Sequence, residues 1–121
     1  MDLPMETPGF PNNGALSKAN YTALMPGGRA CNQALAAARS GAKTALIGKT
    51  GEDSFSNTIL DKLRSEGVIA SGIGRSDLPT GLNLSITDKS GKTQHFYAEG
   101  ANAEITTDQV PDEILNDKAV V

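Results

Sequence analysis

A pair of glycines followed closely by an asparagine is the part of this sequence best suited to binding a ligand. Gly27 and Gly28 come just before a run of strong helix formers, Cys31 to Arg39. Glycine lets the backbone approach a ligand without a Cβ in the way, and a helix start offers unpaired N–H donors to an oxygen-rich ligand. Asn32 adds a carbonyl and an amide, which can bind two neighbouring hydroxyls. The same spacing also fits an ordinary glycine turn, since no GxGxxG or Walker lysine pattern is present.

The elements that would position these residues alternate between helix and strand. The helix predicted over 31–39 should end at Gly41, and the short apolar segment 44–47 is typical of a buried strand. A second helix is predicted from the N-cap residue Asp53 to Gly67. Its apolar side chains recur on one side, at Phe55, Ile59, Leu60 and Leu63. Strand, helix and strand in this order indicate a βαβ layer.

Other segments favour β structure. Residues 82–87 alternate between apolar and polar, and the turn DKSG separates them from KTQHFYA, so a β-hairpin is predicted over 81–98. Residues 1–25 are rich in Pro, Gly and Asn and should form a loop followed by a short strand, which we expect to pair with the hairpin at about 19–25. Thr106 and Gln109 make a capping box. A second short helix is predicted from Pro111, and the final KAVV is typical of the opening of a buried strand.

Length, charge and cysteine content exclude several protein classes. The 121 residues suffice for one domain or part of a larger one, since a domain usually takes about 100–200 residues. A formal charge of −3 without a basic stripe argues against nucleic acid as a partner. No apolar run approaches the roughly 18 residues of a membrane-spanning helix, and the N-terminus MDLPMETPGF does not resemble a signal peptide. With the lone Cys31 unable to form an internal disulfide, we expect a soluble, cytoplasmic protein.

Two residues with reactive side chains are expected to be structural. Cys31 falls in a first helical turn, which favours packing over redox chemistry. His95 lies in the predicted hairpin beside Phe96 and Tyr97, and a lone histidine in a strand is more often structural than a ligand. No second His or Cys is present to share a metal ion, so no metal site is predicted.

The spacing of small and polar residues over the whole chain resembles that of a known enzyme family. Residues 27–51 follow the frame G-G-x-x-x-N-x-A-x6-G-x9-G, which resembles the N-terminal signature of the ribokinase family, the phosphofructokinase-B-type carbohydrate kinases. Four further stretches are similar to motifs of that family, in the same order: FPNNG (10–14), IGKTGED (47–53), TGLNLSI (80–86) and GANAEIT (100–106). The same register places Met1 and Asp2 at the end of the family's N-x-D sugar-binding motif. The resemblance covers essentially all 121 residues.

The resemblance implies an α/β, ribokinase-like fold, in which a partial doubly wound sheet carries a small β lid. The lid strands would lie at about 15–25 and 81–98, and the α/β layer at about 27–70 and 100–121. In family members the lid closes over a sugar and often mediates dimerisation. The apolar face of the hairpin, formed by Leu82, Leu84 and Ile86, favours such a homodimer here. The alternative is a monomer in which the chain's own two helices cover that face.

The resemblance also implies which residues bind the substrate. Asp2 and Asn32 would bind hydroxyls of a sugar, and the backbone at Gly27 and Gly28 would lie against it. Arg29 stands where family members commonly have lysine. Ribose, fructose and nucleoside kinases share this half of the pattern, so the resemblance does not select one sugar.

The same family is much longer than this chain, and its catalytic aspartate and nucleotide pocket belong to a C-terminal half for which residues 1–121 have no counterpart. ATP and Mg²⁺ are expected for an intact family member, but residues 1–121 are expected to hold neither and to include no catalytic residue. The first hypothesis is therefore a fragment that supplies the sugar-binding and lid part of an ATP-dependent carbohydrate kinase. The second is a non-catalytic sugar-binding or dimerisation module.

Overall fold

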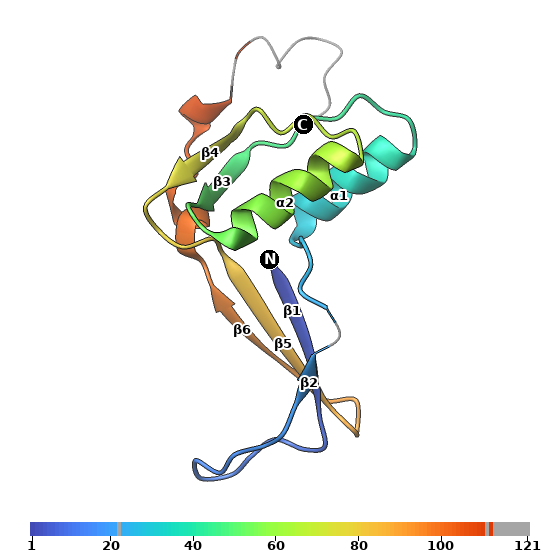
Figure 1. The fold of residues 1–121 in the computed structure, drawn as a ribbon, viewed down its shortest axis with the longest axis vertical. Helices are drawn as coiled ribbons and strands as arrows, with labels where there is room; N and C mark the ends of the chain where they lie inside the picture. Colours follow the sequence, from blue (N-terminus) through green and yellow to red (C-terminus); the bar gives the residue numbers. More distant parts are fainter. Residues whose placement is uncertain (22, 111, 113–121) are drawn as a thin grey trace.

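The computed structural model describes residues 1–21, 23–110 and 112, which form a small α/β layer and a four-stranded sheet that extends away from it (Figure 1). The layer contains α1 (Arg29–Arg39), β3 (Gly48–Gly51), α2 (Ser54–Ser65) and β4 (Ile73–Ser76). The sheet, here called the lid sheet, contains β1 (Asp2–Thr7), β2 (Asn20–Tyr21), β5 (Leu82–Asp88) and β6 (Thr93–Ala98). Two short 3₁₀ helices follow, η1 (Gly100–Glu104) and η2 (Thr107–Gln109).

The layer has the predicted strand, helix and strand order, with β3 and β4 paired in parallel. The strand expected at 44–47 is displaced, because that segment contributes a single β-bridge, between Ala45 and Ile69, and the regular ladder starts only at Gly48. The chain turns at 71–72, between that bridge and the start of β4, which interrupts the pairing. Helix α2 starts as predicted, with the Asp53 carboxylate accepting a hydrogen bond of 2.9 Å from the Ser56 N–H. It ends before Gly67, whose φ of +77° suits glycine.

The core lies between the two helices and the chain that follows α2. Leu63 is fully buried there, packed with Cys31, Ala34, Leu35 and Val68. The alanines of α1 leave space for close approach, as their small side chains suggest. Helix α1 begins two residues earlier than predicted, at Arg29, and ends as expected before Gly41, whose φ is +89°.

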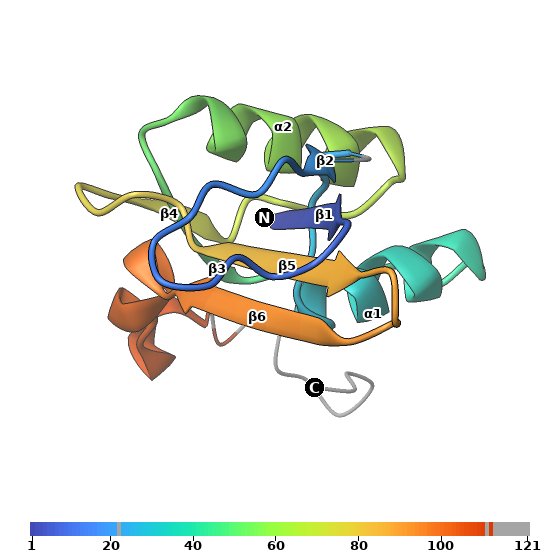
Figure 2. The same ribbon diagram turned by 90° about the horizontal axis from the view of Figure 1, so that it is seen from below.

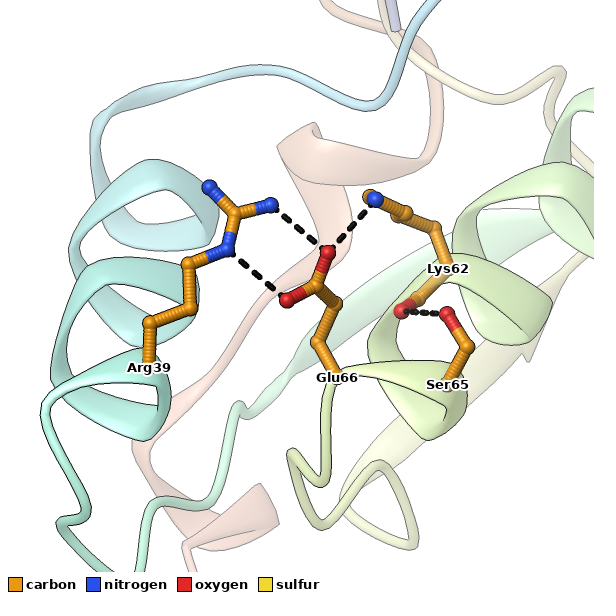
Figure 3. A network of polar contacts seen from close by, with 4 residues as sticks. All are labelled: Arg39, Lys62, Ser65 and Glu66. Atoms are coloured by element: carbon orange, nitrogen blue, oxygen red, sulfur yellow. Dashed lines mark hydrogen bonds and ion pairs between the residues drawn. The ribbon is translucent and has the colours of Figure 1, made fainter.

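An ion-pair network on the surface joins the ends of the same two helices (Figure 3). Arg39 of α1 donates two hydrogen bonds to Glu66, 2.8 Å from Nε to Oε2 and 2.6 Å from Nη2 to Oε1. Lys62 of α2 donates to the same Oε1 over 2.6 Å. These hydrogen bonds, from Arg39 first and Lys62 second, hold the pKa of Glu66 at about 2. The network therefore keeps the Glu66 carboxylate ionised at pH values well above 2.

The lid sheet has the order β2-β1-β5-β6, which corrects two expectations. The hairpin β5–β6 forms as predicted and shares one sheet with the segment near 19–25, but the two do not pair, because β1 lies between them. The strand expected over 15–25 is reduced to Asn20–Tyr21 and a single bridge from Met25 to Asp2. The turn-rich N-terminal segment instead contains a six-residue strand, which pairs in parallel with β5.

Pro4 is the reason that β1 is difficult to recognise in the sequence, because proline lacks the N–H that a central strand uses. The Asp2 N–H donates to the Met25 carbonyl over 2.8 Å, on the side of β1 away from β5. Backbone N–H groups alternate along a strand, so Pro4, two residues later, also faces away from β5. On that side β2 pairs only with Met5 and Glu6. The missing donor therefore falls between the Met25 bridge and the β2 ladder.

The two faces of the lid sheet differ in chemistry. Residues paired across β1, β5 and β6 share a face, so Leu3, Leu84 and Phe96 form one row, and Asp2, Asn83 and Tyr97 form a row on the other side. The first row belongs to an apolar face, on which Phe96 is 55% exposed. Figure 2 shows the strands in the order β2, β1, β5 and β6, and in Figure 1 both helices lie beyond one end of this sheet.

The C-terminal predictions can be followed only in part. The capping box of Thr106 and Gln109 is present, on the short helix η2. The helix expected from Pro111 and the strand expected at KAVV lie outside the described residues. In the part of the chain that the structure describes, no helix is both long and apolar enough to cross a membrane.

Candidate sugar-binding site

A cavity of about 720 Å³ lies where the polar face of the lid sheet meets the start of α1. Its size is within the usual range of small-molecule sites, about 300–1,000 Å³. The four residues that the sequence singled out all line it, although they come from three segments of the chain: Asp2, Gly27, Gly28 and Asn32. The structure therefore brings together every predicted substrate-binding residue.

Asp2 and Gly27 are positioned by the single β-bridge between β1 and the chain before α1. Two backbone hydrogen bonds join Asp2 and Met25, 2.8 Å and 3.0 Å long. They place the Asp2 carboxylate directly against the Cα of Gly27, where a Cβ would overlap with the carboxylate atoms. Glycine is thus required at 27 by the neighbouring carboxylate as well as by any ligand. No hydrogen bond to another described residue engages the Asp2 carboxylate, which leaves its oxygens available as acceptors.

The start of α1 forms the second wall. Gly28 is its N-cap and has a φ of +97°, a conformation that residues with a side chain rarely adopt. No side chain caps the helix, so its first N–H groups have neither an intrahelical partner nor a side-chain partner, and Gly28 and Arg29 at this end line the cavity. The Asn32 N–H donates to the Gly28 carbonyl over 3.0 Å, which closes the first helical turn. Within the described residues the exposed Asn32 amide has no hydrogen-bond partner, and it can both donate and accept.

The third wall is the polar face of the lid sheet with η1, which the sequence analysis did not assign to the site. Its side chains are Asn83, His95, Tyr97 and Asn102, and Arg29 joins the lining from the start of α1. Side chains alternate along β5, so the pattern that places Leu84 on the apolar face places Asn83 and Ser85 on the other face. Where that face points depends on the parallel pairing of β5 with β1, which no local pattern reveals. The sequence predicts a structural role for His95, whereas the structure places this residue in the cavity wall.

Asn102 is held in this wall by close backbone packing. A Cβ at Gly81 would overlap with the Asn102 amide and would lie 2.7 Å from the Glu99 carbonyl oxygen. The Ala101 N–H donates to the Pro79 carbonyl over 2.8 Å, and Ala101 is fully buried. From this position the Asn102 Nδ2 donates to the Tyr97 hydroxyl oxygen over 3.2 Å. The motifs TG at 80–81 and GAN at 100–102 thus meet to shape one corner of the cavity.

A second polar cluster connects the layer to the lid. Asp53 accepts a hydrogen bond from the Thr80 N–H (2.8 Å) and one from its hydroxyl (2.7 Å), in addition to the one from Ser56. Thr80 in turn accepts from the Gly51 N–H over 2.9 Å. Burial alone would raise the pKa of Asp53, but the hydrogen bonds from Thr80 and Ser56 outweigh it and lower the pKa below its usual value. The carboxylate therefore fixes the end of β3, the start of α2 and the start of β5 together.

The surroundings of Cys31, the one cysteine of the chain, disfavour reactivity. The Cys31 thiol is free and buried, and burial raises its pKa, which opposes thiolate chemistry. Among residues 1–21, 23–110 and 112, no group of three or more His, Cys, Asp and Glu side chains could hold a metal ion.

Comparison with known proteins gives a consistent result. The model of the pfkB family carbohydrate kinases matches residues 1–121. The ribokinase of Bacillus subtilis is 32% identical over 114 residues, which are 94% of this chain and 36% of that protein. The chain thus spans about a third of the length of the curated relatives it matches.

Solved structures agree in fold. The ribokinase of Thermotoga maritima has a TM-score of 0.79 at 25% identity, with 93% of this chain and 38% of that chain covered. The ribokinase of Cryptococcus neoformans, solved in complex with ADP, has a TM-score of 0.73 at 26% identity over 88% of this chain and 34% of its own. The ribokinase-like fold expected from the sequence is confirmed, and the chain belongs to the pfkB family of carbohydrate kinases.

Proposed function

We propose that the cavity binds a sugar, and that this chain is the sugar-binding and lid part of an ATP-dependent carbohydrate kinase. The observation that carries the proposal is the convergence of Asp2, Gly27, Gly28 and Asn32 on one cavity. The match to the N-terminal third of ribokinases supports it. The alternative is a sugar-binding or dimerisation module without catalytic activity, for which the same cavity would serve.

The chemistry of the walls suits a polyol. The Asp2 carboxylate can accept hydrogen bonds from two neighbouring hydroxyls, and the Asn32 amide can satisfy a hydroxyl as donor and acceptor. The glycine backbone lets the sugar approach the start of α1 closely. A site that hydrogen-bonds each hydroxyl strongly rejects analogues that lack one. In a kinase these contacts would orient the hydroxyl that receives the phosphoryl group.

We do not assign nucleotide binding to residues 1–121. A ribokinase of the same family is solved with ADP, and ATP with Mg²⁺ is the phosphoryl donor that we infer for an intact family member. Within the described residues neither a cluster of carboxylates suited to Mg²⁺ nor a phosphate-binding glycine loop with lysine is found, so these residues do not fit the nucleotide. We assign no catalytic residue to residues 1–121, and we infer a cytoplasmic location from the free, buried Cys31.

Sugar binding by the 121-residue chain tests the proposal. We expect ligand-observed NMR to detect D-ribose or D-fructose bound to the wild-type chain. Asn32→Ala should weaken that binding about tenfold or more, because a hydroxyl loses its partner inside the cavity. Asn12→Ala, in the exposed loop after β1, is the matched control and should bind like the wild type. A chain that binds neither sugar, or an Asn32→Ala variant with unchanged affinity, would contradict the proposal.

We also propose a homodimer formed by the apolar face of the lid sheet. Leu3 and Leu84 lie on this face beside the exposed Phe96 and Tyr21, and both helices of the layer lie beyond one end of the sheet. Strand β6 is an edge of the sheet, with backbone groups free on one side. A second copy packed on this face would bury the apolar side chains of both sheets.

Leu84→Asp tests the dimer, because it places a charge in the middle of the proposed interface. We expect the wild-type chain to have the mass of a dimer by light scattering at micromolar concentration, and the variant to have the mass of a monomer. Ser85→Asp places the same charge on the polar face and should remain dimeric. A wild-type monomer whose mass and solubility are unchanged by Leu84→Asp would rule out this interface.

A further inference from the structure

We propose that Asn13 is a site of spontaneous deamidation, at which attack by the Gly14 backbone nitrogen releases ammonia and leaves a carboxylate in place of the side-chain amide. The co-reactant is water, and no enzyme or cofactor takes part. Asn13 and Gly14 form the one Asn–Gly pair of the 121 residues. Glycine has no side chain to shield its backbone nitrogen, so this pair is sterically the most open to such an attack. The inference is independent of the proposed function.

The pair occupies the centre of a tight turn in the loop after β1. Asn13 and Gly14 have φ values of +49° and +76°, and the Ala15 N–H donates to the Asn12 carbonyl over 3.0 Å. Two left-handed central residues are typical of a type I′ turn, for which Asn–Gly is a preferred pair. In the left-handed region the backbone nitrogen of the next residue points away from the Cβ. The Gly14 nitrogen therefore reaches the Asn13 side chain only after the turn has opened.

Opening this turn breaks little structure. The bond from Ala15 to Asn12 is the one backbone hydrogen bond that residues 10–16 make with the described residues. Asn13 is exposed, and a Cβ at Gly14 would meet no atom beyond the neighbouring residues within 4 Å. No hydrogen bond to another described residue engages the Asn13 amide or the Gly14 N–H. Both reacting groups are therefore accessible to water once the turn opens.

The loop that carries the turn is closed at its base, so the opening remains local. The Thr7 and Ser17 hydroxyl oxygens are 2.7 Å apart, and they lie 3.0 Å and 2.9 Å from the Gly9 carbonyl oxygen. Thr7 is buried at the end of β1. Figure 1 shows this loop at the end of the lid sheet away from α1 and α2. The turn can therefore open while the lid sheet and the layer stay folded.

The reaction balances with water alone. The Gly14 nitrogen gives its proton to water and forms a bond with the Cγ of Asn13. The Cγ–Nδ2 bond breaks, and the leaving nitrogen takes up a proton and departs as ammonia. Water then opens the resulting cyclic imide at one of its two carbonyl carbons. Attack at Cγ gives aspartate, and attack at the main-chain carbon gives isoaspartate, in which the main chain gains a methylene group. Both products add a negative charge to the turn.

Incubation of the folded chain in water enriched in a heavy oxygen isotope tests the site. Lys18 is the first basic residue, so trypsin releases residues 1–18 as one peptide for mass spectrometry. We expect this peptide to lose ammonia at Asn13, to gain the heavy oxygen, and to separate into aspartyl and isoaspartyl forms. The rate should lie within about tenfold of that in the synthetic peptide, because one hydrogen bond lowers the open fraction by about two- to tenfold. A folded chain that reacts more slowly than this would overturn the proposal.

Two variants identify the reacting residue. Asn13→Gln keeps an amide but would need a larger ring, so it should abolish the conversion. Asn12→Gln leaves the Asn13–Gly14 pair intact, is the matched control, and should react like the wild type. Conversion that persists in Asn13→Gln would place the reaction at Asn12 and overturn the assignment.

Urea below the unfolding midpoint separates local opening from global unfolding. Local opening of an exposed turn uncovers little surface, so the rate at Asn13 should stay nearly constant. A rate that rises in proportion to the unfolded fraction would mean that the reaction requires global unfolding, which would overturn the role of the turn.

Discussion

Helices α1 and α2 bury their apolar side chains against one another, whereas the strands of the lid sheet leave theirs only half-buried. In the layer, Leu63 is completely inaccessible and touches side chains from both helices. In the lid sheet, the polar face forms a cavity wall and the apolar face leaves Phe96 55% exposed. The layer thus contains its own core, while the lid sheet leaves apolar side chains such as Phe96 and Tyr21 exposed to solvent. This difference suits a scaffold that stays fixed and a cover that gains stability from a ligand or a second copy.

The largest expected effect is in the core of the layer. Leu63→Ala should lower the free energy of unfolding by about 2–5 kcal/mol, the usual cost of a cavity in a packed core. Leu84→Ala, in the lid, should cost about 1 kcal/mol in a chain diluted until it is monomeric, because a half-buried leucine loses less transfer energy. Urea unfolding monitored by circular dichroism measures both. Equal losses would show that the lid is packed as tightly as the layer and would break the comparison.

The helices of the layer could be predicted from the sequence because their signals are local. Asp53 and Gly67 mark the ends of α2 by capping and by a positive φ, and both positions behaved as expected. The lid was predicted less well, because β1 pairs with β5, some 80 residues later. In addition, Pro4 is atypical of a central strand, since proline lacks a backbone N–H. Pairing between distant segments leaves no mark on local periodicity.

The candidate site divides in the same way. Gly27, Gly28 and Asn32 follow one another closely at a helix start, so their spacing alone marked them. Asp2 was added only by the resemblance to a family motif. Tyr97 and Asn102 could not be assigned, because their place in the cavity depends on the strand register and on the close packing of Asn102 against Gly81.

The next effect concerns the contact that joins the two regions. Asp53→Ala removes the cap of α2 and leaves the Thr80 N–H without its acceptor, and together these losses should cost about 2–3 kcal/mol. Asp61→Ala, on the exposed side of α2, is the matched control and should cost less than about 0.5 kcal/mol. Hydrogen exchange at Thr80 should become faster in Asp53→Ala only.

Asp53→Asn sharpens this test. Its remaining carbonyl oxygen can still accept from Ser56, so α2 keeps its cap, but the amide nitrogen cannot accept from Thr80. Faster exchange at Thr80 with unchanged protection in α2 would assign Asp53 to the junction. Loss of protection in α2 alone would mean that Asp53 serves the layer and not its connection to the lid.

The smallest effect is expected at the surface network that joins the two helices of the layer. Hydrogen bonds from Arg39 and Lys62 lower the pKa of Glu66 from 4.5 to about 2 in the folded chain. Because the folded-state pKa lies below the ordinary value, the network stabilises the fold fully above about pH 4.5, and this contribution is lost as the pH falls toward 2. Glu66→Gln should therefore lower the urea midpoint at pH 7 and should approach the wild-type midpoint as the pH decreases through this range. Glu52→Gln, at an exposed position before the N-cap of α2, removes a carboxylate that has no ion pair among the described residues and is the matched control. Because the Arg39 and Lys62 side chains are 57% and 42% exposed, the difference at pH 7 should also shrink in 1 M salt, and a difference that persists at low pH or in salt would assign the effect of Glu66 to packing.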